Sequence, residues 1–288
     1  MDSPNDFRGR AWRTGLVALL VTSWLFLMMR LLPNGDTDNP FGHGFSADIS
    51  SPVLALELSR TTDDVEKVLH RRAGPAAVAE RAIGALRLNT LLELVFIPLY
   101  VGYLILLARL FTASLPGVPV SRLRNWVTAA AVGTGVFDYV EDWFMFSTLG
   151  GAEPLEFAPS VIKWLLLAVT LLLLGCCIVR SGAPVYSFAT RALLGSAHVV
   201  AGLLMLIGVV FAPLIGYSCL ELGNSVFGVT VAVNVVGLLG PSVAQFFPGH
   251  DVAYVKDFCE KLRRGIATPP AVRAVPAPPT DEPPFSTT

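Results

Sequence analysis

Six apolar stretches recur along this chain, and each is long enough to cross a lipid bilayer as a helix. An α-helix rises about 1.5 Å per residue, so about 20 residues span the hydrocarbon core. Only helices and closed barrels satisfy every backbone polar group inside lipid. The sequence therefore predicts an all-α, polytopic bundle of about six transmembrane helices. The expected spans are 11–32, 89–111, 123–149, 158–179, 189–215 and 222–247.

The composition agrees with a membrane protein and gives little sign of other partners. Charged residues make up 15% of the chain, against about 25% in soluble domains. The net charge of −1 gives no reason to expect nucleic-acid binding. We expect the bilayer itself as a partner, with a membrane protein or a second copy of the chain as a further one. The cysteines have neither a disulfide nor a zinc-site spacing; they are Cys176, Cys177, Cys219 and Cys259.

The segments between and beyond the spans divide into three kinds. Residues 1–11 form a polar N-terminus, and the first span looks like an uncleaved signal anchor. Residues 33–88 form a polar loop in which Thr61 or Thr62 can cap a short helix. A second helical run over 76–88 leads into the next span. The tail, 248–288, begins as an amphipathic helix and continues as a proline-rich segment expected to be disordered.

Basic residues predict the orientation of the bundle. They gather beside the N-terminus, beside two alternate connections and in the tail, whereas the two short connections on the other side carry only Lys163 at a border. The positive-inside rule then places both termini in the cytoplasm of a cell-membrane protein. The arginines and lysines that carry this prediction are Arg8, Arg10, Arg13, Arg109, Arg122, Arg124, Arg180, Arg191, Lys256, Lys261, Arg263 and Arg264.

The third span contains three acids where hydrocarbon tolerates few. Asp138, Glu141 and Asp142 lie at i, i+3 and i+4, so they fall within roughly 100° of arc on one helix face. An acid near the bilayer centre costs about 2.5–3.5 kcal/mol on insertion scales, and such residues usually face a bundle interior. These three are the candidate catalytic residues of the chain.

Four further polar residues are expected at the same depth as the acids. Asn89, Glu93 and Tyr100 share one face of the second span, and Lys163 lies near the start of the fourth. Together they predict a polar pocket in the outer half, between the second, third and fourth spans. Four carboxylates and one lysine should not all ionise together, so we expect a proton on Asp138 or Glu141 at neutral pH.

Three kinds of function remain open for this pocket. We favour a structural or partner-binding role, in which the acids pair with Lys163 and fix the helices. The acids could instead serve a membrane-embedded enzyme on a lipid substrate, as acid–base groups or as ligands of a divalent cation. In that case the metal ligands would come from Asp138, Glu141, Asp142 and Glu93. A cation- or proton-coupled transporter is the third possibility.

Two stretches resemble a group of uncharacterised bacterial polytopic membrane proteins. One is 54–62, followed by Val65, Leu69 and the span with 96–100; the other is 137–142. In that group an outer helical segment precedes a span with an aromatic-Tyr pattern, and a later span carries Asp-x-x-Glu followed by Asn. Here Asp142 takes the Asn position. The resemblance implies a bacterial inner-membrane location and no activity, and it groups the loop helix with the second and third spans.

Overall fold

The computed structural model describes residues 4–31, 51–69, 76–113, 115, 120–182, 186–212, 217–246 and 260. Every regular element among them is a helix, so the predicted all-α bundle is confirmed. The six long helices are α1 (Pro4–Leu31), α4 (Ala76–Thr112), α5 (Val120–Leu149), α6 (Phe157–Arg180), α7 (Phe188–Val210) and α9 (Ser218–Phe246). The two short helices are α2 (Pro52–Glu57) and α3 (Thr62–Val68). The expected irregular loop at 33–50 and almost all of the tail lie outside the described residues.

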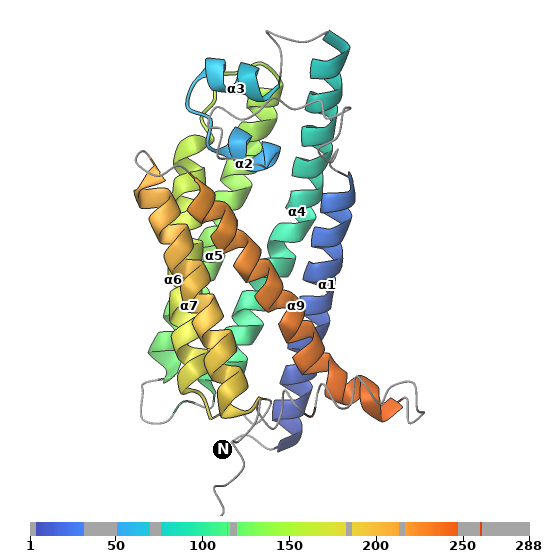
Figure 1. Cartoon of the computed structure of the whole chain (residues 1–288), viewed down its shortest axis with the longest axis vertical. Coiled ribbons are helices and arrows are strands. Elements are labelled where there is room, and N and C mark those ends of the chain that lie inside the picture. Colours follow the sequence, from blue (N-terminus) through green and yellow to red (C-terminus); the bar gives the residue numbers. More distant parts are fainter. Residues whose placement is uncertain are drawn as a thin grey trace, which may run out of the picture.

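The six long helices form a closed ring in chain order. Each packs on the next, and α9 returns to pack on α1. Consecutive helices run in opposite directions, and α2 and α3 lie at the end of the bundle where α5 ends and α6 begins (Figure 1). We call this the cap end. The ring buries a core that includes Tyr103, Leu104 and Leu107 of α4.

Five of the long helices are apolar and long enough to cross a membrane: α1, α4, α6, α7 and α9. The exception among the six is α5, which carries the three acids. It nevertheless packs between α4 and α6 as a member of the ring. Exposed tryptophans mark both of its ends, since Trp126 and Trp143 are 70% and 73% exposed. They are about 26 Å apart along the helix axis.

The helix boundaries differ from the expected spans at several places. Helix α1 begins at Pro4 rather than 11, and α5 begins at Val120 rather than 123. The helical run at 76–88 and the second span form one continuous helix, α4. Helix α7 ends at Val210 rather than 215, because the chain bends at Phe211. Helix α9 begins at Ser218, four residues before the expected start. The helix α2 was not expected; Ser51 caps it by accepting a hydrogen bond from the Leu54 N–H, and Pro52 occupies its first turn.

Helix α3 follows the prediction from its sequence. The Thr61 side chain accepts from the Asp64 N–H, and the Asp64 carboxylate accepts from the Thr61 N–H, which forms a capping box. Val65, Val68 and Leu69 are buried, as their helical spacing indicates. The short helices therefore pack on the bundle as a folded cap.

A tight turn between α5 and α6 sets the depth at which their side chains meet. The Ala152 N–H donates to the Ser147 carbonyl and the Gly151 N–H to the Thr148 carbonyl, which is the Schellman pattern. Gly151 has φ of +100°, a conformation that favours glycine. The connection is short, so Lys163 in the second turn of α6 returns to the level of the acids on α5.

Candidate functional site: a lysine among carboxylates at the cap end

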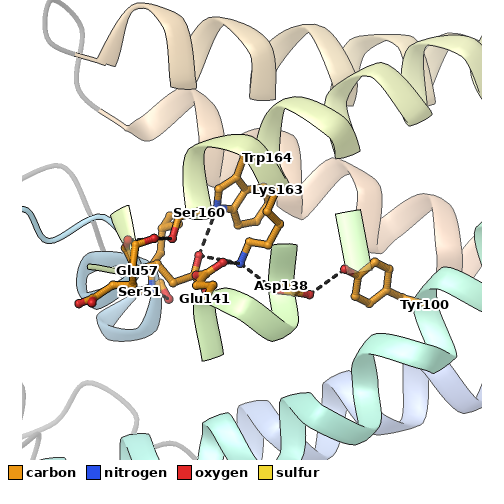
Figure 2. A network of polar contacts seen from close by, with 10 residues as sticks. Ser51, Glu57, Tyr100, Asp138, Glu141, Ser160, Lys163 and Trp164 are labelled. Atoms are coloured by element: carbon orange, nitrogen blue, oxygen red, sulfur yellow. Dashed lines mark hydrogen bonds and ion pairs between the residues drawn. The ribbon is translucent and has the colours of Figure 1, made fainter. Parts of the chain in front are cut away.

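Lys163 lies at the centre of the polar cluster. Its Nζ is 2.6 Å from Glu141 Oε2, 3.0 Å from Asp138 Oδ1 and 3.1 Å from Glu57 Oε2. The lysine side chain is only 8% exposed. Figure 2 shows the ammonium pointing between the three carboxylates. We call Lys163, Glu57, Asp138 and Glu141 the Lys163 cluster.

Three elements supply this cluster. Asp138 and Glu141 are one turn apart on α5, so they present their carboxylates on the same face. Lys163 comes from α6, and Glu57 is the last residue of α2. The ammonium thus joins the cap to two long helices. An ion pair with an excellent fit on several sides can offset the cost of burying its charges.

A second layer of hydrogen bonds orients two of the carboxylates. The Tyr100 hydroxyl donates to Asp138 Oδ2 at 2.7 Å, and Trp164 Nε1 donates to Glu57 Oε2 at 3.1 Å (Figure 2). The Ser160 hydroxyl lies 2.9 Å from the Glu57 carbonyl, which holds the backbone of α2 on α6. Asp138 and Glu57 are therefore each held from a second direction besides that of the ammonium.

A further acidic group lies beside the cluster, between α4 and α5. Asp142 is 1% exposed and lies on α5, which packs on the helix α4 that carries Glu93. Glu93 is half-buried. Asn89 lies one turn before Glu93 on the same helix and is buried. Among the described residues, Asn89 Oδ1 and Asp142 Oδ2 have no hydrogen-bond partner.

Tyr139 on α5 contacts α4 near Pro98. Pro98 lies inside α4 and has no N–H, so the carbonyl four residues earlier loses its helical donor. That carbonyl belongs to Leu94, and the Tyr139 hydroxyl donates to it at 3.0 Å. A side chain from α5 thus replaces the missing backbone hydrogen bond, as expected for proline inside a membrane helix.

The arrangement bears on whether the acids hold a metal. No group of three or more His, Cys, Asp or Glu side chains in the described ranges has the geometry of a metal site. The space between Asp138, Glu141 and Glu57 is taken by the Lys163 ammonium. In this arrangement the lysine supplies the positive charge that a divalent cation would otherwise bring. The histidines of the outer loop, His43 and His70, lie outside the described residues.

The structure brings four of the expected site residues into contact and adds one that the sequence reasoning missed. Asp138 and Glu141 contact Lys163, and Tyr100 binds Asp138. Asp142, Glu93 and Asn89 lie on the same two helices, α5 and α4. Glu57 was missed. It is an isolated acid in the apolar run 53–58, and this is the signal that could have pointed to it.

His198 belongs to a different part of the bundle. Its Nδ1 lies 2.8 Å from the Leu194 carbonyl, and its ring packs edge-on against Phe227 of α9. Another buried network joins α4 to α9: Asn234 Nδ2 donates to the Tyr103 hydroxyl, and the Tyr186 hydroxyl donates to Asn234 Oδ1. Both groups hold helices together away from the Lys163 cluster.

Glu156 lies next to the cluster at the turn before α6. It is fully buried, and Thr148 donates to its Oε2 at 2.8 Å. Burial raises the pKa of Glu156 above its usual value, while hydrogen bonds to its carboxylate partly oppose the shift. Its Oε1 has no hydrogen-bond partner in the part of the chain that the structure describes. Ionised Glu156 is therefore poorly solvated at this position.

Comparison of the chain with protein-family models, with curated proteins and with solved structures finds no match.

Proposed function

We propose that this is a six-span protein of the cell membrane, with both termini in the cytoplasm, whose Lys163 cluster clamps an outer cap onto the bundle. In this proposal the cluster is structural, and the protein acts by holding a partner in the membrane. The partner is either another membrane protein or a second copy of the chain.

The orientation is supported by where the basic residues fall. The start of α1, the end of α4 with the start of α5, and the end of α6 with the start of α7 lie at the end opposite the cap (Figure 1). Arginines flank each of them, such as Arg10, Arg122 and Arg180. This is the distribution that the positive-inside rule associates with the cytoplasmic face. The cap end would then face the outside.

The single observation that carries the structural role is that Lys163 contacts side chains from two other helices. Its ammonium contacts carboxylates from α2 and from α5 while its own backbone belongs to α6. Each of the three carboxylates in the Lys163 cluster is thus paired with the ammonium. A catalytic acid–base pair would need one of these groups to face a substrate.

The structural role is tested by separating abundance from activity in the native host. We expect Lys163→Met and Glu57→Gln to lower the amount of folded protein, with any phenotype falling in proportion. The matched control is Lys67→Met, since Lys67 is an exposed residue of α3 that pairs with Asp63. Normal abundance of Asp138→Asn and Glu141→Gln together with a lost phenotype would contradict the structural role and favour chemistry or transport.

The partner-holding role is tested by the mass of the protein in its native state. Native mass spectrometry of protein released from its own membrane in mild detergent should show a stoichiometric complex, either with itself or with one membrane protein. A strictly monomeric chain under these conditions argues against this part of the proposal.

A further inference from the structure

Three exposed arginines lie at the end of the bundle opposite the cap, each in the terminal turn of its helix. Arg109 is in the last turn of α4, Arg122 in the first turn of α5 and Arg180 in the last turn of α6. These helix ends lie at the same end of the bundle (Figure 1), and α5 packs between α4 and α6. The three positive charges are therefore at a similar depth on three neighbouring helices.

Each arginine continues the exposed, largely apolar face of its helix. Helical spacing places other exposed residues within about 40° of arc of each arginine. They are Val95 on α4, Trp126, Val136 and Val140 on α5, and Val169 and Cys176 on α6. Such faces of a membrane bundle meet the acyl chains, and a long basic side chain at a helix end reaches the headgroups. The arginines thus face the lipid rather than the interior of the ring.

No acid neutralises these arginines along their own helices. In the sequence, α4 has no acid after Glu93, α5 has none before Asp138, and α6 has none at all. The connections 113–119 and 181–187 contain no acid either. Within the described residues, no hydrogen bond or ion pair engages the three guanidinium groups. Their charge and their donors are therefore available to a partner.

Trp126 adds an apolar contact just below the charge. It lies one turn further along α5 than Arg122, about 6 Å deeper, and on the same face. Its side chain is 70% exposed. Tryptophan in membrane proteins sits at the level where headgroups meet acyl chains, and arginine binds phosphate through two parallel N–H donors. This vertical order of arginine and tryptophan matches the order of phosphate and acyl chain in a phospholipid.

We propose that the surface formed by Arg109, Arg122, Trp126 and Arg180, which we call the arginine face, binds an anionic phospholipid. The guanidinium groups hold the phosphate, and the acyl chains lie along the exposed face of α5. Neighbouring helices are about 8–10 Å apart, so arginines from two helices reach one headgroup. Basic residues at this level attract anionic lipids, and the ammonium of a zwitterionic lipid opposes that attraction. This assignment rests on the membrane placement proposed above, and it is independent of the structural role of the Lys163 cluster.

Native mass spectrometry of the full-length protein in detergent measures which lipid it binds. Phosphatidylglycerol and phosphatidylcholine with the same acyl chains are added separately, at equal concentrations. We expect wild type to bind phosphatidylglycerol at least about tenfold more tightly. Arg122→Gln and Arg180→Gln should each lower this preference about fivefold, the effect of one basic residue at an anionic surface. Arg81→Gln is the matched control, since Arg81 is an exposed residue near the other end of α4, and it should leave the preference unchanged.

Equal binding of the two lipids by wild-type protein would overturn the assignment, whatever the variants do. A preference that survives in the folded triple variant Arg109→Gln, Arg122→Gln, Arg180→Gln would overturn it too, because charge elsewhere would then hold the lipid. A dimer that excludes added lipid would give the arginine face to a second copy of the chain. Protein that is absent from the membrane fraction of its host would contradict the membrane placement itself, whereas a membrane protein without lipid preference would contradict only the lipid site.

Discussion

At the scale of single residues, the site is defined by one buried ammonium and the carboxylates around it. Lys163 Nζ lies within 3.1 Å of Glu57, Asp138 and Glu141. Removing one member of a buried ion network leaves the others uncompensated, and this costs more than the network itself contributes. The sensitivity of the fold should therefore be greatest at Lys163.

Lys163→Met should destabilise the protein strongly, by about 3–5 kcal/mol, which is the range for breaking a buried pair. The measurement is the free energy of unfolding in detergent, in the same buffer for each variant. Lys67→Met removes an exposed i,i+4 partner of Asp63 and should cost no more than about 0.5 kcal/mol. Similar losses in the two variants would contradict a central role for Lys163.

Glu156→Gln should stabilise the protein in a pH-dependent way. Burial raises the pKa of Glu156 in the folded state, so its contribution is most favourable at low pH and is lost as the pH rises through the raised pKa. Glutamine keeps an acceptor for Thr148 and cannot ionise. The melting temperatures of wild type and variant should agree in acid and separate toward neutral pH, with the variant higher. Glu153→Gln, at an exposed position, should show no such separation; equal curves for Glu156→Gln and wild type would count against the burial argument.

At the scale of elements, neighbouring helices supply what the sequence of one helix lacks. Pro98 deprives the Leu94 carbonyl of its donor, and Tyr139 of α5 provides a replacement. Elsewhere glycine permits the close approach of α6 and α7, where a Cβ at Gly175 would lie 2.6 Å from the Gly195 carbonyl. Small residues serve this purpose in membrane bundles generally.

Tyr139→Phe should cost about 1 kcal/mol, the net contribution of one hydrogen bond. In a Pro98→Ala background the backbone N–H restored by the alanine can donate to the Leu94 carbonyl, so the cost of Tyr139→Phe should shrink. A double-mutant cycle on the free energy of unfolding measures this coupling. Equal costs in the two backgrounds would show that Tyr139 does not replace the proline's missing donor.

Gly195→Ala should destabilise the α6–α7 interface by about 1–3 kcal/mol, the usual cost of overpacking. The new Cβ would lie 2.7 Å from the Gly175 carbonyl, which cannot move without shifting α6. Gly102→Ala is the control, because a Cβ there has open space inside helix α4 and should stabilise by about 0.5–1 kcal/mol. Thermal unfolding of both variants checks the expected difference in sign.

At the scale of the whole molecule, the closed ring of helices follows from patterns that are visible in the chain. Apolar runs predict the long helices, and helical spacing predicts the acidic face of α5. The short turns before α6 and α7 favour antiparallel neighbours. These local features are enough to place Lys163 at the level of Asp138 and Glu141. The depth of the acids along α5 and the depth of the lysine along α6 are both measured from the same tight turn.

Sequence patterns could not predict where Glu57 lies in the fold, for a physical reason. It lies 106 residues before Lys163, on a six-residue helix whose place on the bundle depends on tertiary packing. Short helices are set by packing rather than by propensity. The extent of α4 was visible in the chain, since no proline separates 76–88 from the span. The function is not readable from such patterns, because acids paired with lysine serve structure and chemistry alike.

The central claim is that the Lys163 cluster holds the cap on the bundle, and hydrogen exchange measures this most directly. In wild type the backbone amides of α2 should be protected to a degree close to those of α6. In Glu57→Gln and Lys163→Met, the protection of α2 should fall by an order of magnitude or more, about 1.4 kcal/mol per tenfold change, while that of α7 persists. Unchanged protection of α2 in both variants would contradict the claim.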